Sequence, residues 1–154
     1  MESSLYARTH SVIWKLTSVA WAGLIFYLST GGFGSSFSEW LLTQTLAVLH
    51  VTVAPATFEV LHVLMRKSAH MTEYAILGML LYGSRNDHPF EWRPRRALAC
   101  VAIAAAYSLT DEFHQSFVPG RTASLSDCGI DTIGATLGIL VYYLRHWWHR
   151  VGGS

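Results

Sequence analysis

Long apolar stretches, separated by short charged segments, dominate the hydrophobic pattern of this chain. No charged residue occurs between Leu16 and Ser38, and about 20 apolar residues suffice to span the hydrocarbon core of a bilayer. The segment Ser11–Thr30 is too long for a signal-peptide core and has no convincing cleavage site, which predicts an uncleaved transmembrane helix. Three further apolar blocks are Ala69–Ser84, Ala97–Thr110 and Cys128–Trp148. Each spans the bilayer if the charged residues at one of its ends are included.

The segment Trp40–Phe58 also lacks formal charge and competes as a fifth span. A fifth span would turn the four-arginine loop Arg85–Arg96 to the outside, against the positive-inside rule. The segment also contains Gln44, His50 and Pro55, which are unusual in the middle of a span. We therefore interpret it as one or two amphipathic interfacial helices on the outer surface, broken at Pro55.

The distribution of basic residues sets the orientation of the four spans. Eight of the eleven basic residues lie before the first span, between the second and third, or after the fourth: Arg8, Lys15, Arg85, Arg93, Arg95, Arg96, Arg145 and Arg150. Seven of the ten acids lie in the remaining segments. The positive-inside rule then places both termini in the cytoplasm. The sequence predicts an all-α, polytopic membrane protein with four transmembrane helices, forming a single domain over residues 1–154.

Composition agrees with a membrane protein. The chain is 51% hydrophobic and only 14% charged, whereas soluble domains carry about 25% charged residues. A formal net charge of +1 argues against a basic nucleic-acid-binding domain, and two cysteines argue against a disulfide-stapled secreted module. We expect no nucleic-acid partner.

Polar side chains gather at the outer ends of three spans. They are Lys67, His70, Glu73 and Tyr74 in the second span, Asp111, Glu112, Gln115 and His114 in the third, Arg121 in the next loop, and Asp127 and Asp131 in the fourth. Each alone reads as a helix cap or boundary residue, since an acid near a helix start complements the helix dipole. Ionisable residues within spans normally face the bundle interior or a wet cavity. Their shared depth predicts one outward-opening pocket, above a close helix contact at Gly134 and Gly138.

The charge of this pocket leaves two alternatives open. Lys67 and Arg121 oppose five acids, and an uncompensated negative charge in a low-dielectric site must be protonated or bind a cation. His70 and His114 supply part of the balance as imidazolium, or a divalent metal does, with His70, His114, Glu112 and Asp127 as candidate ligands. Glu112 is expected to pair with Arg121 or a ligand. Asp111 is expected to bind Lys67 or a helix-start amide.

Four motifs carry a resemblance to a known family. They are Lys67-x-x-His70-x-x-x-Tyr74, Asp111-Glu112-x-x-Gln115, Pro119-Gly120-Arg121, and Asp127-x-x-x-Asp131-x-x-Gly134-x-x-x-Gly138. Together they resemble the VanZ-like family of bacterial membrane proteins, with the motifs confined to about residues 66–140. The family is named for an accessory protein that raises teicoplanin resistance. The resemblance implies a small multi-pass protein of the bacterial cytoplasmic membrane that acts at the cell envelope, without an established reaction.

Two kinds of function fit these residues. In the first, Lys67 and Arg121 bind the phosphate or carboxylate of a membrane lipid or lipid-linked envelope molecule. The remaining ligand contacts would be Tyr74, Asp111, Gln115, Asp127 and Asp131.

In the second, the protein is a membrane-embedded enzyme, metal-dependent if a metal binds, that hydrolyses or transfers part of such a lipid. Glu112, or else Glu73, would act as general base. His70 or His114 would act as proton carrier or metal ligand, and Arg121 as stabiliser of developing charge. A non-catalytic structural membrane protein is the third reading.

Overall fold

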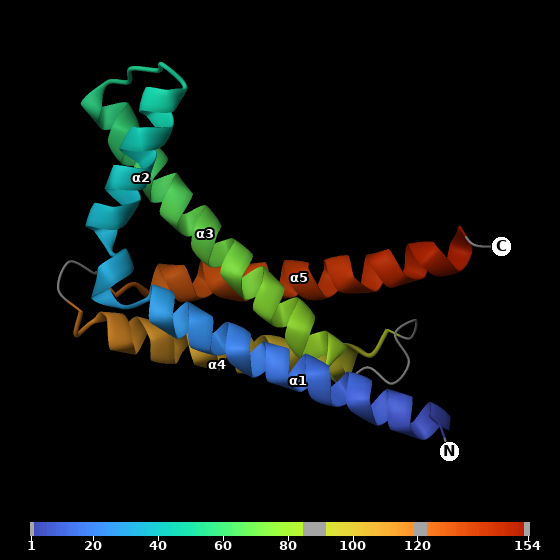
Figure 1. Cartoon of the computed structure of the whole chain (residues 1–154). Helices are drawn as coiled ribbons and strands as arrows, with labels where there is room; N and C mark the ends of the chain where they lie inside the picture. The colour runs from blue at the N-terminus through green and yellow to red at the C-terminus, as the bar shows by residue number, and fades with distance from the viewer. Residues whose placement is uncertain (1, 85–91, 119–122, 153–154) are drawn as a thin grey trace.

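The computed structural model describes residues 2–84, 92–118 and 123–152 (Figure 1). These residues form helices and no strands, which confirms the all-α prediction. The elements are α1 (Glu2–Leu28), a short 3-10 helix (Gly31–Phe33), α2 (Ser35–Val48), α3 (Pro55–Gly83), α4 (Pro94–Gln115) and α5 (Leu125–Val151).

The helix starts follow from local sequence. Pro55 and Pro94 stand at the first turns of α3 and α4, where the missing N–H and the fixed φ of proline suit a helix start. Ser124 caps α5, because its Oγ accepts a hydrogen bond from the backbone N–H of Ser126.

The predicted break at Pro55 needs correction. Helix α2 ends at Val48, and Pro55 begins a helix rather than interrupting one. Residues 55–66 are therefore the first turns of α3, continuous with the predicted second span, and the 3-10 helix and α2 are the separate helices between α1 and α3 in the described chain.

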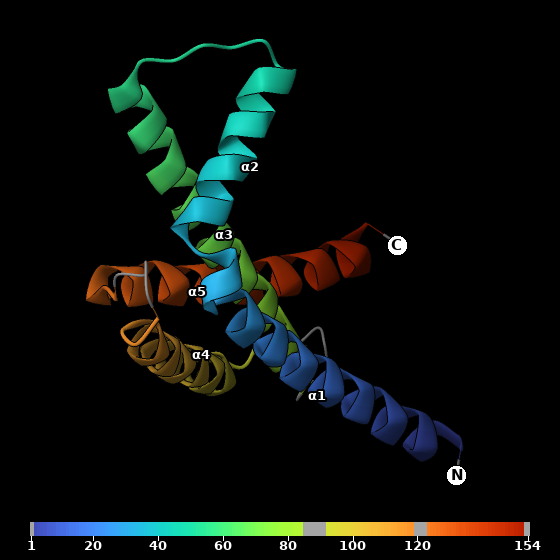
Figure 2. The same cartoon turned by 60° about the vertical axis from the view of Figure 1, so that its left-hand side comes forward.

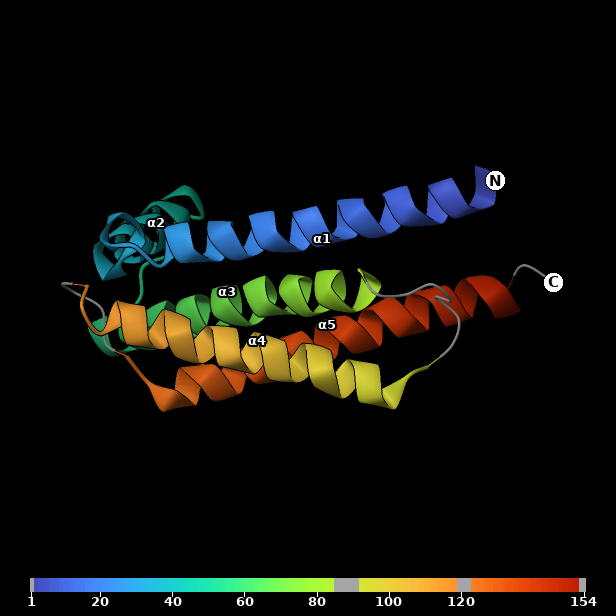
Figure 3. The same ribbon diagram turned by 90° about the horizontal axis from the view of Figure 1, so that it is seen from below.

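Helices α1, α4 and α5 run along a common direction, and α3 crosses them obliquely (Figures 1 and 3). Both described chain ends lie at one end of this bundle. The opposite end, which we call the site end, holds the end of α1, the end of α4 and the start of α5. Helix α2 projects sideways from the site end, away from α4 and α5, and with the first half of α3 it forms an open V (Figure 2).

Small residues allow α3 and α5 to cross at close range. A Cβ added at Gly138 would collide with the backbone oxygen of Ala75, and one at Gly134 with that of Met71. A Cβ at Gly78 would in turn collide with the backbone of Ala135. The predicted packing role of Gly134 and Gly138 is confirmed, and the contact sets the position of α3 against α5.

Away from the site end the interior is mostly apolar, and so is much of the outer surface. A buried cluster that includes Tyr74, Leu77 and Ala135 lies directly beneath the site end. Large apolar side chains such as Leu98 (70% exposed) and Val19 (72%) cover the outside of the bundle. Apolar surfaces this extensive are typical of contact with lipid rather than water.

Two helices contain stretches long and apolar enough to cross a membrane, Ser11–Leu28 in α1 and Leu125–His149 in α5, within the part of the chain that the structure describes. In α3 the charge of Glu73 interrupts the apolar run, and in α4 only residues 97–110 lack charge. The four-span topology therefore stays a prediction.

Candidate functional site

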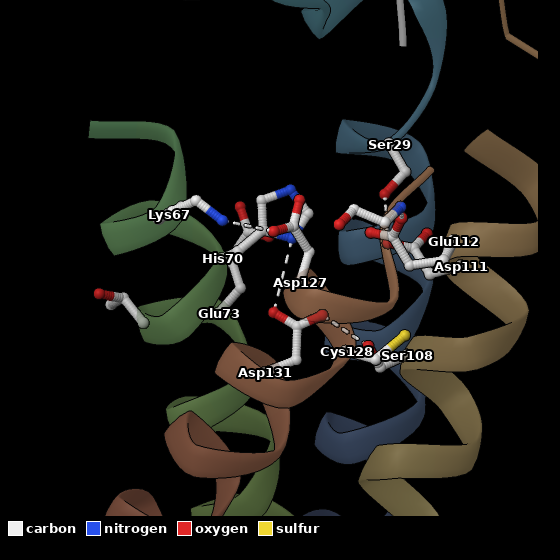
Figure 4. A network of polar contacts seen from close by, with 12 residues as sticks. Ser29, Lys67, His70, Glu73, Ser108, Asp111, Glu112, Asp127, Cys128 and Asp131 are labelled. Atoms are coloured by element: carbon white, nitrogen blue, oxygen red, sulfur yellow. Dashed lines mark hydrogen bonds and ion pairs between the residues drawn. The ribbon is translucent and has the colours of Figure 1, made fainter. Parts of the chain in front are cut away.

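Two acid–base pairs lie between α3 and α5 at the site end. The Nζ atom of Lys67 donates to Oδ1 of Asp127 at 2.6 Å, and Nδ1 of His70 lies 3.6 Å from Oδ1 of Asp131. Lys67 and His70 are one turn apart on α3, as are Asp127 and Asp131 on α5, so the pairs stack along the helix contact. Figure 4 shows these side chains pointing toward one another.

Asp131 ties together three helices. Its carboxylate is fully buried, Ser108 of α4 donates to its Oδ2 at 2.6 Å, and its Oδ1 faces His70 of α3. A buried carboxylate is costly unless hydrogen bonds compensate it. Asp131 therefore depends on both neighbouring helices, and Ser108 is a site residue that the sequence analysis did not select.

Asp111 binds the end of α1, which corrects the prediction for this residue. Its Oδ2 accepts hydrogen bonds from Ser29 Oγ at 2.8 Å and from Gln115 Nε2 at 2.9 Å. We expected a contact with Lys67 or a helix-start amide, but Lys67 is paired with Asp127. The sequence did not identify Ser29 as a site residue, because it is an ordinary small polar residue at the end of an apolar segment.

Glu112 makes the helix-start contact that we expected of Asp111. Its Oε2 accepts a hydrogen bond of 2.6 Å from the backbone N–H of Ser124, the residue that caps α5. Consecutive residues on a helix point to different neighbours, as predicted, but Glu112 rather than Asp111 meets the start of α5, and Asp111 meets the end of α1 instead. Arg121 lies outside the described residues, so its predicted pairing with Glu112 stays a prediction.

The remaining predicted residues surround this network. Tyr74 is fully buried beneath it, whereas Glu73 is only partly buried. The ring of His114 packs against Phe26, with 4.5 Å between centroids. Among the described residues, no three His, Cys, Asp or Glu side chains form a group that could hold a metal ion.

Several buried polar atoms of the network have no hydrogen-bond partner within the described chain. They are Nδ1 of His70 and of His114, the Tyr74 hydroxyl, Oδ1 of Asp111 and of Asp131, and Oε1 of Glu112. The 3.6 Å separation of His70 and Asp131 is too long for a hydrogen bond. An unsatisfied buried polar group costs about 1–3 kcal/mol. Such a concentration is typical of a functional site.

Among the described residues, three pockets open at the site end. One of about 320 Å³ lies between the end of α4 and the start of α5, and the other two lie on either side of α3. The first of these two has a volume of about 210 Å³ and lies between α3 and the start of α5. We call it the α3–α5 pocket; its lining is Val63, Arg66, Lys67, His70, Ser124, Ser126, Asp127 and Ile130. The second, the α2–α3 pocket, has a volume of about 170 Å³. Its lining is Leu28, Ser29, Phe33, Phe37, Ser38, Leu41, Met65, Arg66, Ala69, His70 and Glu73.

Arg66 and His70 line both the α3–α5 pocket and the α2–α3 pocket. They are four residues apart and therefore lie on one face of α3. His70 was among the predicted site residues, whereas Arg66 had no predicted role, although the four-residue spacing of the two is visible in the sequence. In the described part of the chain Arg66 has no ion pair, whereas Lys67 is held by Asp127.

Comparison with protein families gives one match. A family model described as VanZ/LLP1 matches residues 14–146, which include every residue of the network and both pockets. Comparisons with curated proteins and with solved structures give no match.

Proposed function

Because the chain belongs to the VanZ/LLP1 family, we propose that it is a membrane protein whose α3–α5 pocket binds the anionic headgroup of an envelope lipid or lipid-linked envelope molecule. One observation carries this proposal. Arg66, Lys67 and His70 line one wall of the pocket, and the capped start of α5, with Ser124 and Ser126, lines the other. A helix N-terminus and basic side chains together favour a phosphate or carboxylate.

Arg66 is the principal anion contact in this proposal. Lys67 is held by Asp127, so its positive charge is already opposed, whereas Arg66 has no ion pair in the described chain. A guanidinium also binds a phosphate by two parallel hydrogen bonds, which fixes orientation as well as charge.

The proposed arrangement in the membrane has four spans, α1, α3, α4 and α5, with α2 in the outer interface. Basic residues at the end of the bundle opposite the site, including Arg95, Arg96 and Arg145, support a cytoplasmic location for that end. The site end would then open outward, toward the envelope. The bacterial cytoplasmic membrane and a contribution to teicoplanin resistance are further parts of the proposal, since they come from the family resemblance alone.

The proposal is tested by lipid binding to the purified protein. We expect phosphatidylglycerol to bind more tightly than phosphatidylcholine in native mass spectrometry, and Arg66→Gln to weaken that binding about tenfold or more, the effect of losing a hydrogen bond to a charged group. Arg66→Lys should retain part of the affinity. Arg95→Gln, at an exposed position near the opposite end, is the matched control. Equal binding of the two lipids, or unchanged binding by Arg66→Gln, would contradict the proposal.

A specific observation also favours a second candidate function, a membrane-embedded enzyme acting on the bound lipid. Asp131 lies beside Nδ1 of His70 and is itself held by Ser108, while His70 lines both pockets. A carboxylate that orients an imidazole is a common device for general base catalysis. Turnover of a native lipid extract, lost in His70→Gln, would support this function, and no turnover by the unaltered protein would exclude it.

A further inference from the structure

We infer that the α2–α3 pocket holds one hydrocarbon chain of the lipid whose anionic headgroup occupies the α3–α5 pocket. This inference rests on the proposed function and names its ligand more closely, as an anionic lipid that lies across α3. The site would then bind a lipid at two points rather than a soluble phosphate at one.

The two pockets share lining residues on α3. Arg66 and His70 line both, so a headgroup held by Arg66 lies at the boundary between them. A chain attached to that headgroup reaches the α2–α3 pocket without leaving the protein surface.

The walls of the α2–α3 pocket are mainly apolar. Phe33, Phe37 and Leu41 line the α2–α3 pocket from the 3-10 helix and α2, and Leu28 and Met65 close it from α1 and α3. Its polar lining residues include Arg66, Ser29 and Glu73. An apolar wall joined to a cationic boundary complements a molecule with an anionic head and a hydrocarbon tail.

The position of α2 also favours a lipid. Helix α2 projects sideways from the site end and exposes the apolar side chains of Trp40, Leu41 and Phe37. In the proposed orientation these side chains are at the depth of the lipid headgroups and the first methylenes. A lipid therefore enters the site sideways from the outer leaflet, beneath α2.

In this arrangement the bound headgroup positions the hydrocarbon chain of the lipid in the α2–α3 pocket. A chain already surrounded by lipid gains little from moving into another apolar pocket, because the hydrophobic driving force is absent in a bilayer. Chain occupancy should consequently depend on Arg66, whereas headgroup binding should not depend on the apolar wall. This asymmetry distinguishes a site that binds both the headgroup and one acyl chain from an apolar groove unrelated to headgroup binding.

The experiment uses phosphatidylglycerol with a photoreactive diazirine midway along one acyl chain. The lipid is incorporated into nanodiscs that contain the full-length protein. We expect labelling of peptides that contain Phe37, Leu41 and Met65, and Arg66→Gln should reduce it about tenfold, in step with headgroup binding. Ala69→Phe fills the α2–α3 pocket from α3, and Leu41→Trp fills it from α2. Both should abolish this labelling and leave the binding of phosphatidylglycerol unchanged.

Val60→Phe, at an exposed α3 position outside both pockets, is the matched control and should label like the parent. Thermal unfolding of each variant shows whether it is folded. If the protein prefers phosphatidylglycerol to phosphatidylcholine but the acyl-chain diazirine labels only the outer apolar faces of the helices, this inference fails and the proposed function stands. If the preference for phosphatidylglycerol is absent, both fail, whatever the labelling pattern.

Discussion

Gly138→Ala tests the helix contact on which the site depends. Gly138 lies where α5 meets α3, and an added Cβ would collide with the backbone oxygen of Ala75. Backbone atoms cannot rotate away as a side chain can, so α3 must shift relative to α5. Gly129 is the matched control, because a Cβ added there on the same helix would have nothing within 4 Å.

Both substitutions change helix propensity by the same amount, but only Gly138→Ala overpacks the contact between α3 and α5. Replacing a helical glycine by alanine stabilises a helix by about 1 kcal/mol, and this gain is common to both positions. Overpacking a well-packed contact costs about 1–3 kcal/mol, and only Gly138→Ala incurs it. We expect Gly129→Ala to raise the free energy of unfolding, and Gly138→Ala to be about 1–3 kcal/mol less stable than that control.

The assay is unfolding of the detergent-solubilised protein, followed by helical circular dichroism, combined with lipid binding to the folded fraction. The pairs Lys67–Asp127 and His70–Asp131 bridge the same two helices within three turns of Gly138. A shift of α3 should therefore weaken phosphatidylglycerol binding as well. If Gly138→Ala is as stable as Gly129→Ala, the close approach of α3 and α5 is not what holds the site together.

Three further predictions concern the site and the topology. Ser108→Ala removes the donor of a 2.6 Å hydrogen bond to a fully buried carboxylate, so chemical or thermal unfolding should show a loss of about 1–3 kcal/mol. Lys67→Met should cost only about 0–1 kcal/mol in the same assay, because its pair with Asp127 is partly exposed to solvent. A cysteine at position 116 should react with a membrane-impermeant reagent from outside intact cells and one at position 86 should not; the reverse would overturn the topology.

Local and periodic features of this protein were readable from the sequence. Apolar runs marked α1 and α5, and the four-residue spacing of Asp111 and Gln115 placed two now buried side chains on one face of α4. These features depend only on helical periodicity and on the cost of charge in an apolar medium, which act within one helix. The gathering of polar groups at the site end followed from the same arguments.

The partners of those polar groups were decided by tertiary structure. Asp111 binds Ser29, which is 82 residues away, and no local pattern relates the two. Glu112 took the helix-start contact expected of Asp111, because the neighbours of each helix face depend on how α4 lies against α1 and α5. Periodicity determines which face a side chain occupies but not which helix that face meets.

For Arg66, too, the sequence determines the helix face and the tertiary structure decides what that face meets. Its position next to Lys67 was plain, and a helical repeat placed it on one face with His70. Only the oblique path of α3 puts that face between two pockets, one lined by α5 and the other by α2. The sequence by itself determined that charge gathers at one end of an apolar bundle. The crossing of α3 decided which charges are paired and which face a pocket, because that crossing arises from contacts between distant segments.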